Sequence, residues 1–264
     1  MALASHGVPS EVLYEERGQV GVVTINRPEA RNALTFNTYA LLEEAVRSSG
    51  ARCLVVTGAD PAFCSGDDVK QIMAGSGSKV ADGLQAAPRL TPAAAAFLST
   101  DIPVVAAVNG PAVGWGMELA LLADIRIASD RARFGELFVK RGLCCDVAGL
   151  GRLAGVVGRE RAAELLFTGR LIDAHEALSA GLVSRVVAHD DLMPSAMLLA
   201  GEIASNPPLA VQSLKRGLRA ALDPDWDALG EWVSVTLSAL FRTEDHREGV
   251  AAFLEKRPAR YSGR

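Results

Sequence analysis

Apolar and polar positions follow strand-like patterns in some segments of the first half of the chain and helical spacing in others. Residues 12–25 show the alternation typical of β-strands, interrupted at Arg17–Gly18. Residues 53–57 and 103–108 are short, continuous apolar runs bounded by turn residues, as buried parallel strands are. Residues 36–47 carry apolar side chains at helical spacing. This alternation of strands and helices predicts an α/β fold in which helices flank the sheet.

The second half of the chain has a mainly helical pattern from residue 158 onward. Helices are expected over residues 174–180, 190–205, 207–222, 225–241 and 244–255, with a short strand at 183–187. We therefore divide the chain into a core domain of residues 1–190 and a C-terminal helical oligomerisation subdomain of residues 191–264. Residues 73–92, rich in Gly, Ser and Ala without a clear period, are expected to form a long loop.

Composition narrows the class of protein. The chain has 264 residues, close to the upper size for a single hydrophobic core. Hydrophobic residues make up 49% of it, which excludes an intrinsically disordered protein. Only 5% are aromatic, so the core must be built from Ala, Val, Leu and Ile. The net charge of −4 argues against a nucleic-acid-binding protein, which normally carries an excess of basic residues.

We expect no metal site, disulfide framework or membrane segment. The four cysteines lack the C-x-x-C spacing of zinc and redox sites: Cys53, Cys64, Cys144 and Cys145. Residues 1–10 lack the charged start and apolar stretch of a secretory signal. Residues 102–123 are apolar enough to raise the question of a membrane span, but Pro103, Asn109 and Glu118 interrupt them. We expect a soluble, cytoplasmic protein.

Two glycine-rich turns are the first candidates for chemistry. Residues 62–69 (Ala-Phe-Cys-Ser-Gly-Asp-Asp-Val) follow the first apolar run, and residues 109–118 (Asn-Gly-Pro-Ala-Val-Gly-Trp-Gly-Met-Glu) follow the second. Proteins of the α/β class bind ligands at the carboxyl ends of strands, where glycine lets backbone amides approach the ligand. Two amides that converge on one oxygen form an oxyanion hole, in which each donor contributes roughly 3–4 kcal/mol. The alternative is a pair of ordinary tight turns.

Six segments, in order and at matching spacing, resemble the crotonase (enoyl-CoA hydratase/isomerase) superfamily over residues 12–261. They are residues 27–34 (Arg-Pro-Glu-Ala-Arg-Asn-Ala-Leu), 63–69, 106–120, 123–128, 168–183 and 253–257. The resemblance implies a crotonase-like spiral of ββα units with C-terminal helices used for trimerisation. It also implies an acyl-CoA thioester as substrate and an enolate stabilised by two backbone amides. Coenzyme A is then part of the substrate, and no separate cofactor or metal is expected.

By position, the resemblance assigns the oxyanion-hole amides to Asp67 and Trp115 and the first catalytic acid/base to Glu118. The alternative role for Glu118 is a carboxylate that complements the dipole of its helix. Residues expected to bind the substrate are Glu29, Ala30, Arg31, Ala33, Gly66, Asp68, Val69, Lys70, Gly114, Phe138, Phe253 and Lys256. In the family, residues 29–33 line the adenine site, residues 67–70 follow the pantetheine, and the tail around 253–256 often reaches a neighbour's CoA.

The chain departs from the family where the second catalytic glutamate is expected. That position holds Phe138, and Glu136 lies two residues earlier, where on a helix it would face another direction. Asp146 stands where typical hydratases have glycine, and some isomerases and aryl-CoA dehalogenases have an aspartate there that faces the acyl group. Asp146 is therefore the second catalytic candidate, with a helix N-cap as its alternative role. Trp115 and Asp67 stand where the family commonly has small residues.

We place reversible hydration of a 2-trans-enoyl-CoA first, because it is the commonest activity of the family. An isomerase that moves a double bond with Asp146 needs no activated water, so the loss of the second glutamate favours it. A third alternative is a binding protein that keeps the CoA site and has lost turnover. We expect an acyl-CoA as the small-molecule partner, no nucleic-acid or membrane partner, and a homotrimer or a dimer of trimers.

Overall fold

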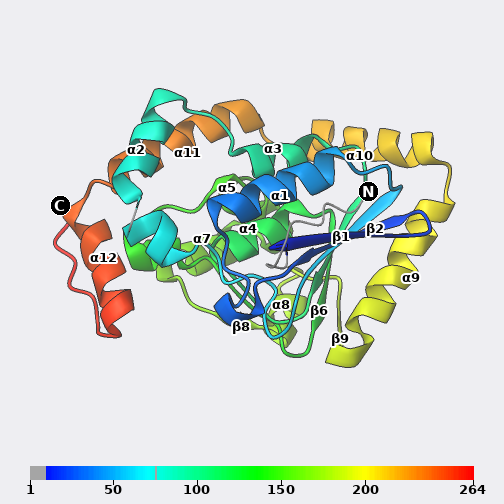
Figure 1. Ribbon diagram of the computed structural model, residues 1–264, viewed down its shortest axis with the longest axis horizontal. Coiled ribbons are helices and arrows are strands. Elements are labelled where there is room, and N and C mark those ends of the chain that lie inside the picture. Colours follow the sequence, from blue (N-terminus) through cyan, green and yellow to red (C-terminus); the bar gives the residue numbers. More distant parts are fainter. Residues whose placement is uncertain (1–9, 75) are drawn as a thin grey trace.

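The computed structural model describes residues 10–74 and 76–264, so the expectation about the N-terminal segment falls on residues outside this range, apart from Ser10. Six strands form its central sheet (Figure 1): β1 (Val12–Arg17), β2 (Val20–Ile25), β3 (Cys53–Gly58), β4 (Val104–Val108), β6 (Ile125–Ser129) and β9 (Arg185–Val187). They lie in the order β1–β2–β3–β4–β6–β9. β1 and β2 are antiparallel, and the later neighbours are parallel. The predicted α/β class is confirmed.

A second, smaller sheet lies beyond the carboxyl ends of the central strands. It contains β5 (Pro111–Val113), β7 (Arg133–Gly135) and β8 (Ile172–Asp173). β4 leads through a short turn into β5, and β6 leads in the same way into β7, so the chain passes repeatedly from the large sheet to the small one. This repetition brings the turns that follow the central strands to one edge of the molecule.

Helices surround both sheets (Figure 1). Their bounds are α1 (Phe36–Arg47), α2 (Gly77–Ala86), α3 (Pro92–Ser99), α4 (Trp115–Leu122), α5 (Val147–Gly151), α6 (Leu153–Val157), α7 (Arg159–Thr168), α8 (Ala174–Ser179), α9 (Leu192–Ser205), α10 (Pro208–Leu222), α11 (Trp226–Leu240) and α12 (Glu244–Glu255). Within the described residues, none of these helices combines the length and the apolar character needed to cross a bilayer. Three segments of the described chain have 3₁₀ geometry: Pro28–Ala30, Leu137–Arg141 and His189–Asp191.

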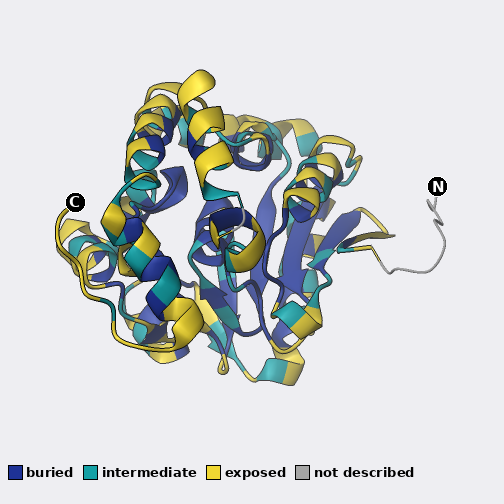
Figure 2. Cartoon of the chain, turned by 60° about the vertical axis from the view of Figure 1, so that its left-hand side comes forward, coloured by how far each residue is buried: buried dark blue, intermediate teal, exposed yellow. Residues whose placement is uncertain are grey.

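The central strands are buried on both faces, as their continuous apolar runs predict (Figure 2). Val23 and Val56 point into the main core, whereas their neighbours Val22 and Val55 face α9. α9 covers that second face with small or apolar side chains spaced four residues apart: Leu192, Ala196, Ala200 and Ala204. α9 therefore packs with the strands, although it lies in the expected subdomain of residues 191–264. The domain division and the use of the subdomain for oligomerisation stay predictions.

The expectation of a long loop over residues 73–92 is wrong. The π-helix Val69–Ala74 and α2 occupy most of this stretch, and α2 lies against α11. Ser238 on α11 donates its hydroxyl proton to the carbonyl oxygen of Ala81 at 2.8 Å. The small residues give little periodic signal along the sequence, but they allow α2 to approach α11 closely. This tertiary contact, between residues 157 positions apart along the chain, stabilises the helix.

A buried lysine and a half-buried arginine attach α10 to the core. The Lys215 side chain is 6% exposed, and its ammonium group donates to the Ile102 carbonyl and to Asp124, each at 2.8 Å. Arg219 forms an ion pair with Asp101 at the end of the segment that follows α3. These contacts satisfy the charges inside the fold and fix the position of α10 over the edge of the sheet.

Candidate active site

The two glycine-rich turns predicted from the sequence touch each other. Cys64 and Ala112 form an isolated parallel bridge, with the Cys64 amide donating to Pro111 at 3.0 Å and the Val113 amide to Cys64 at 3.0 Å. Gly66 has φ +84°, and a Cβ at this position would lie 2.8 Å from the Val113 carbonyl oxygen and 3.3 Å from the Trp115 nitrogen. Only glycine tolerates both that backbone conformation and that approach.

The amides of Asp67 and Trp115 have no hydrogen-bond acceptor among the described residues. Trp115 is the first residue of α4, so its N–H has no partner within the helix. Leu34 bonds to Gly66 and Asp68 on either side of Asp67, which leaves the Asp67 N–H free. Both residues line one small cavity of about 20 Å³ beside Gly66 and Gly114. Two free donors at one cavity are what an oxyanion hole requires.

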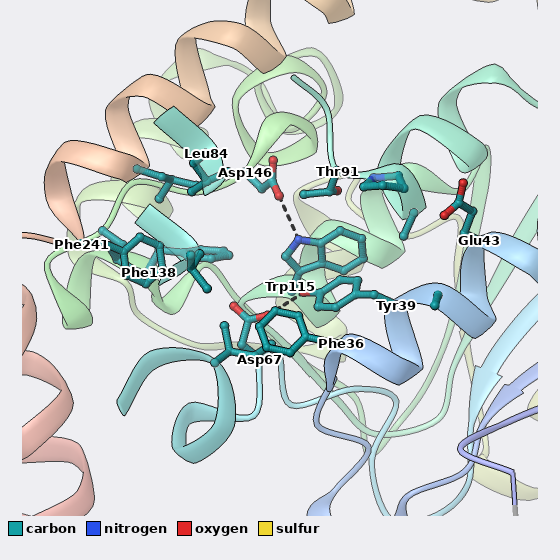
Figure 3. Close-up of a pocket in the computed structure, with 17 residues that line it drawn as sticks. Phe36, Tyr39, Glu43, Asp67, Leu84, Thr91, Trp115, Phe138, Asp146 and Phe241 are labelled. Carbon is teal, nitrogen blue, oxygen red and sulfur yellow. Dashed lines mark hydrogen bonds between the residues drawn. The ribbon is translucent and has the colours of Figure 1, made fainter. Parts of the chain in front are cut away.

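A larger apolar cavity of about 340 Å³ adjoins this small one (Figure 3). Its walls come from α1, α2, α3 and α11, and its lining residues include Phe36, Tyr39, Glu43, Leu84, Thr91, Phe138, Leu143 and Phe241. Asp67, Trp115 and Phe138 line both cavities. We call this larger space the acyl cavity, because an apolar volume next to two free amides suits the acyl part of a thioester.

Two aromatic side chains each orient one aspartate in the acyl cavity (Figure 3). The Tyr39 hydroxyl donates to Asp67 at 2.6 Å, and the Trp115 indole N–H donates to Asp146 at 2.9 Å. The two rings meet edge to face, with centroids 4.7 Å apart at 88°. Burial raises the pKa of Asp67 to about 6, although the Tyr39 bond opposes this rise. Burial likewise raises the pKa of Asp146, against the lowering effect of the indole bond.

Asp146 also occupies the N-cap of α5, where its Oδ1 accepts from the Val147 amide at 2.7 Å. The N-cap role that the sequence left open is thus present, and it coexists with a position in the wall of the acyl cavity. Because one oxygen caps the helix and the other accepts from Trp115, the carboxylate is held in a single orientation. A fixed, buried carboxylate beside an apolar cavity is suited to accept and return protons.

Glu118 lies deeper than expected. The residue is 1% exposed and does not line the acyl cavity. Its Oε2 accepts from the amides of Ala148 and Gly149 in α5, at 2.8 and 3.0 Å. Its Oε1 has no partner among the described residues. Burial raises the pKa of Glu118 well above its usual range, and Glu136 raises it further.

Glu136 was set aside on the ground of helical spacing, and that reason was wrong. It does not lie within a helix but immediately before the 3₁₀ helix Leu137–Arg141, with ψ 85°, so helical spacing does not govern its direction. The residue is 1% exposed, and neither carboxylate oxygen has a partner among the described residues. Burial raises the pKa of Glu136 well above its usual range, and the nearby Asp146 raises it further.

A second cavity of about 680 Å³ lies on the other side of Phe138. Glu136, Cys144 and Cys145 line it, and Phe138 and Leu143 line both this cavity and the acyl cavity. The phenyl ring of Phe138 is therefore part of the wall between the two spaces.

The predicted CoA-binding strip lies next to the first turn. The Ser65 amide donates to the Arg31 carbonyl at 3.1 Å, and the Leu34 amide donates to Gly66 at 2.8 Å. Residues 29–33 therefore run beside residues 65–68, with Glu29 and Arg31 exposed and Ala30 and Ala33 more buried. Val69 lines the small cavity, and the exposed Lys70 follows it on the π-helix.

The predicted tail residues lie on the far side of the site. Phe253 on α12 is 52% exposed, and the Arg141 guanidinium stacks on its ring at 4.4 Å from the centroid. Lys256 ends α12 in a left-handed conformation and is exposed. Arg141 itself lines the small cavity. In this chain, Phe253 is linked to the site through Arg141, and any contact with CoA stays a prediction.

Sequence reasoning missed the aromatic wall. Tyr39 and Phe36 come from α1 and Phe241 from the end of α11, so no local spacing links them to the two turns. Over residues 10–74 and 76–264, no group of three or more His, Cys, Asp or Glu side chains is arranged to hold a metal ion. The chemistry available is that of two free amides, the half-buried carboxyl group of Asp67 and the three buried carboxyl groups of Glu118, Glu136 and Asp146.

Known proteins share this architecture. The profile of the enoyl-CoA hydratase/isomerase family matches residues 15–264. Short-chain-enoyl-CoA hydratase from Clostridium acetobutylicum is 36% identical over 263 residues, which cover 94% of this chain and 96% of that one. The crystal structure of an enoyl-CoA hydratase/isomerase from Pseudoalteromonas atlantica T6c superposes with a TM-score of 0.84 at 31% identity, covering 96% of this chain and all of the other.

A monofunctional enoyl CoA isomerase from M. smegmatis superposes with a TM-score of 0.67 at 31% identity, covering 85% of this chain and 99% of the other. Hydratases and an isomerase thus share the fold described here, and the expected crotonase fold is confirmed. The whole-length match decides the assignment. The chain belongs to the enoyl-CoA hydratase/isomerase family of enzymes.

Proposed function

We propose that this enzyme adds water reversibly to the double bond of a 2-trans-enoyl-CoA. The water oxygen bonds to C3 as one of its O–H bonds breaks and the proton goes to the Glu118 carboxylate. The electrons of the double bond move to the thioester oxygen as an enolate, and C2 then takes the proton from Glu118. The reverse sequence removes water from a 3-hydroxyacyl-CoA. The amides of Asp67 and Trp115 carry the enolate charge, and Glu118 is the acid/base. These free amides at one small cavity are the observation that carries the proposal.

The binding site follows from the same placement. The thioester oxygen lies at the two amides, the acyl chain occupies the acyl cavity, and the pantetheine runs along Asp68, Val69 and Lys70. The strip of residues 29–33, in which Glu29 and Arg31 are exposed, leads from there to solvent, where the adenine part of CoA has room. Coenzyme A belongs to the substrate, so no further cofactor is needed. We also propose a homotrimer or dimer of trimers that works in the cytoplasm.

A double-bond isomerase is the second candidate, and one observation favours it. Asp146 lines the acyl cavity, whereas Glu118 does not. Asp146 takes a proton from C2 of a 3-enoyl-CoA, the same amides hold the enolate, and the proton returns to C4 to give the 2-enoyl-CoA. This sequence needs no water. The third candidate, a binding protein without turnover, has no observation of its own in its favour.

Proton NMR of a medium-chain 2-trans-enoyl-CoA in D2O distinguishes the candidates. Hydration gives a 3-hydroxyacyl product, and Glu118→Gln lowers its rate by about 100-fold or more, the usual effect of losing a positioned acid/base. Isomerisation instead places deuterium at C4 without a hydroxyl signal, and Asp146→Asn abolishes it. If wild-type enzyme binds the acyl-CoA in calorimetry but changes none of its signals, both catalytic proposals are wrong.

A further inference from the structure

Three carboxyl groups lie in a row around the first turn of α5. Asp146 accepts from the Val147 amide, and Glu118 accepts from the next two amides, those of Ala148 and Gly149. The carboxylates of Asp146 and Glu118 are therefore held by three consecutive amides. Neighbouring amides of a helix place their acceptors close together, so this first pair is fixed by the backbone.

The missing side chain of Gly149 makes room for the second pair. A Cβ at this position would lie 2.7 Å from Oε1 of Glu118 and 3.1 Å from Oε1 of Glu136. Neither oxygen has a hydrogen-bond partner among the described residues, and both residues are 1% exposed. Buried polar atoms almost always have a partner, so two partnerless carboxylate oxygens around one point indicate a shared proton or a bridging water.

The row has different surroundings at its two ends. Asp146 lines the acyl cavity, Glu136 lines the second cavity, and Glu118 lines neither. The wall of Phe138 and Leu143 separates the two cavities. Other titratable groups beside the row are the thiols of Cys144 and Cys145, whose pKa values burial raises, so they stay neutral.

We propose that Asp146, Glu118 and Glu136 form a proton relay between the acyl cavity and the second cavity. Glu136 is its outer member and exchanges protons with solvent there while a bound acyl-CoA fills the acyl cavity. Glu136 is thus a positioning residue, which acts on the reacting carbon through Glu118 and Asp146. This inference rests on the proposed function in one respect, because the proton that the relay carries comes from an acyl-CoA.

The proton balance of the relay is simple. Asp146 takes a proton from C2 and becomes neutral, while the electron pair of the C–H bond moves into the enolate. Transfer of a proton to Glu118 and onward to Glu136 restores the Asp146 carboxylate, and Glu136 releases the proton to solvent. In reverse, a solvent proton reaches C2 by the same route. No oxidant, reductant or co-reactant takes part.

Deuterium exchange at C2 of a saturated acyl-CoA tests the relay without requiring hydration or isomerisation. In D2O, wild-type enzyme exchanges the C2 protons, as NMR detects. We expect Glu136→Gln to slow this exchange by roughly 10- to 100-fold while acyl-CoA affinity stays unchanged, because the first proton acceptor remains in place. The matched control is Glu202→Gln, an exposed carboxylate on α9, which should exchange as wild type does.

Infrared spectroscopy of the ligand-free enzyme gives a second readout. At neutral pH the wild type should show the carbonyl band of a protonated, buried carboxyl group, and Glu136→Gln should remove or shift that band. If Glu136→Gln fails to fold, Glu136→Asp replaces it and should shift the same band. Unchanged exchange together with an unchanged band overturns the relay. If the wild-type enzyme neither binds an acyl-CoA nor exchanges its C2 protons, the proposed function is wrong instead. In that case the infrared band still tests whether Glu118 and Glu136 share a proton.

Discussion

Tyr39 and Trp115 each donate a hydrogen bond to a different aspartate. Each buries an aromatic ring in the wall of the acyl cavity and directs its single polar hydrogen at one carboxylate, Asp67 or Asp146. A hydrogen bond from a neutral donor stabilises the charged form of a carboxyl group, whereas burial destabilises it. The balance of these two effects sets the protonation state of both aspartates near neutral pH.

Trp115→Phe should shift the pH dependence of any step that uses Asp146 as a base. The variant keeps an aromatic ring and the backbone amide but loses the indole donor, so the pKa of Asp146 rises further. The acid limb of kcat against pH therefore moves to higher pH, and stability falls by about 1 kcal/mol. Tyr39→Phe is the comparison, because it removes the donor to Asp67 only. Equal pH profiles for Trp115→Phe and wild type would contradict the prediction.

Asp67→Asn should change how stability depends on pH. Folding raises the pKa of Asp67 from 3.8 to about 6, so the folded state loses stability as pH rises through this window. The asparagine variant lacks that loss. Its free energy of unfolding relative to wild type should therefore increase by about 2 kcal/mol between pH 4 and pH 7, as urea unfolding measures. A constant difference across this range would sink the argument.

At the scale of elements, the short helix α5 organises the acidic groups. Asp146 caps it, Glu118 accepts from its second and third amides, and Gly149 leaves the space into which two carboxylates point. A glycine within a helix normally lowers stability relative to alanine. Glycine is needed at position 149 because Oε1 of Glu118 and Oε1 of Glu136 occupy the space that a side chain would fill.

Gly149→Ala should lower activity without raising stability. The new Cβ would meet Oε1 of Glu118 at 2.7 Å and push that carboxylate away from its amides. We expect a fall in kcat of about 10-fold or more and no gain in stability, because the lost hydrogen bonds offset the helix preference of alanine. Gly155→Ala is the matched control on α6, where a Cβ meets nothing within 4 Å. That variant should keep full activity and gain up to about 1 kcal/mol.

Element prediction failed where long-range contacts decide the structure. The stretch of residues 73–92 has weak periodicity, and its helix α2 exists because α11 packs on it. Glu136 was judged by helical spacing, but it precedes the 3₁₀ helix with a non-helical ψ of 85°, and its side chain is buried. By contrast, α1 and α12 match their predicted bounds, because amphipathic spacing and capping residues are local signals.

At the scale of the whole molecule, the acyl cavity is assembled from distant parts of the chain. α1 supplies Phe36 and Tyr39, α2 and α3 supply the rim, and the end of α11 closes it with Phe241. Phe138 and Leu143 then divide this cavity from the second one. The depth available to an acyl chain is therefore set by that wall.

Phe138→Ala should join the two cavities and lengthen the acyl chain that the enzyme accepts. We expect kcat/KM to move toward longer enoyl-CoA substrates, measured over a series of chain lengths, with a loss of about 3 kcal/mol in stability from removing a buried ring. Phe241→Ala is the comparison, because Phe241 lines the acyl cavity but not the second one. If both variants change the length profile alike, Phe138 does not act as a partition.

From the sequence alone we could predict the α/β class, the bounds of α1 and of α8 to α12 within about two residues, and the two glycine-rich turns. These features depend on spacing, glycine and strand-sized apolar runs within one segment. The sequence also placed Asp67, Trp115 and Asp146, which lie on those turns or cap a helix. Long-range packing determines that Glu118 does not line the acyl cavity and that the carboxylates of Glu118 and Glu136 both lie beside Gly149. The reason is physical: the direction of a buried side chain depends on which distant elements leave space and offer hydrogen-bond donors, and no local pattern records them.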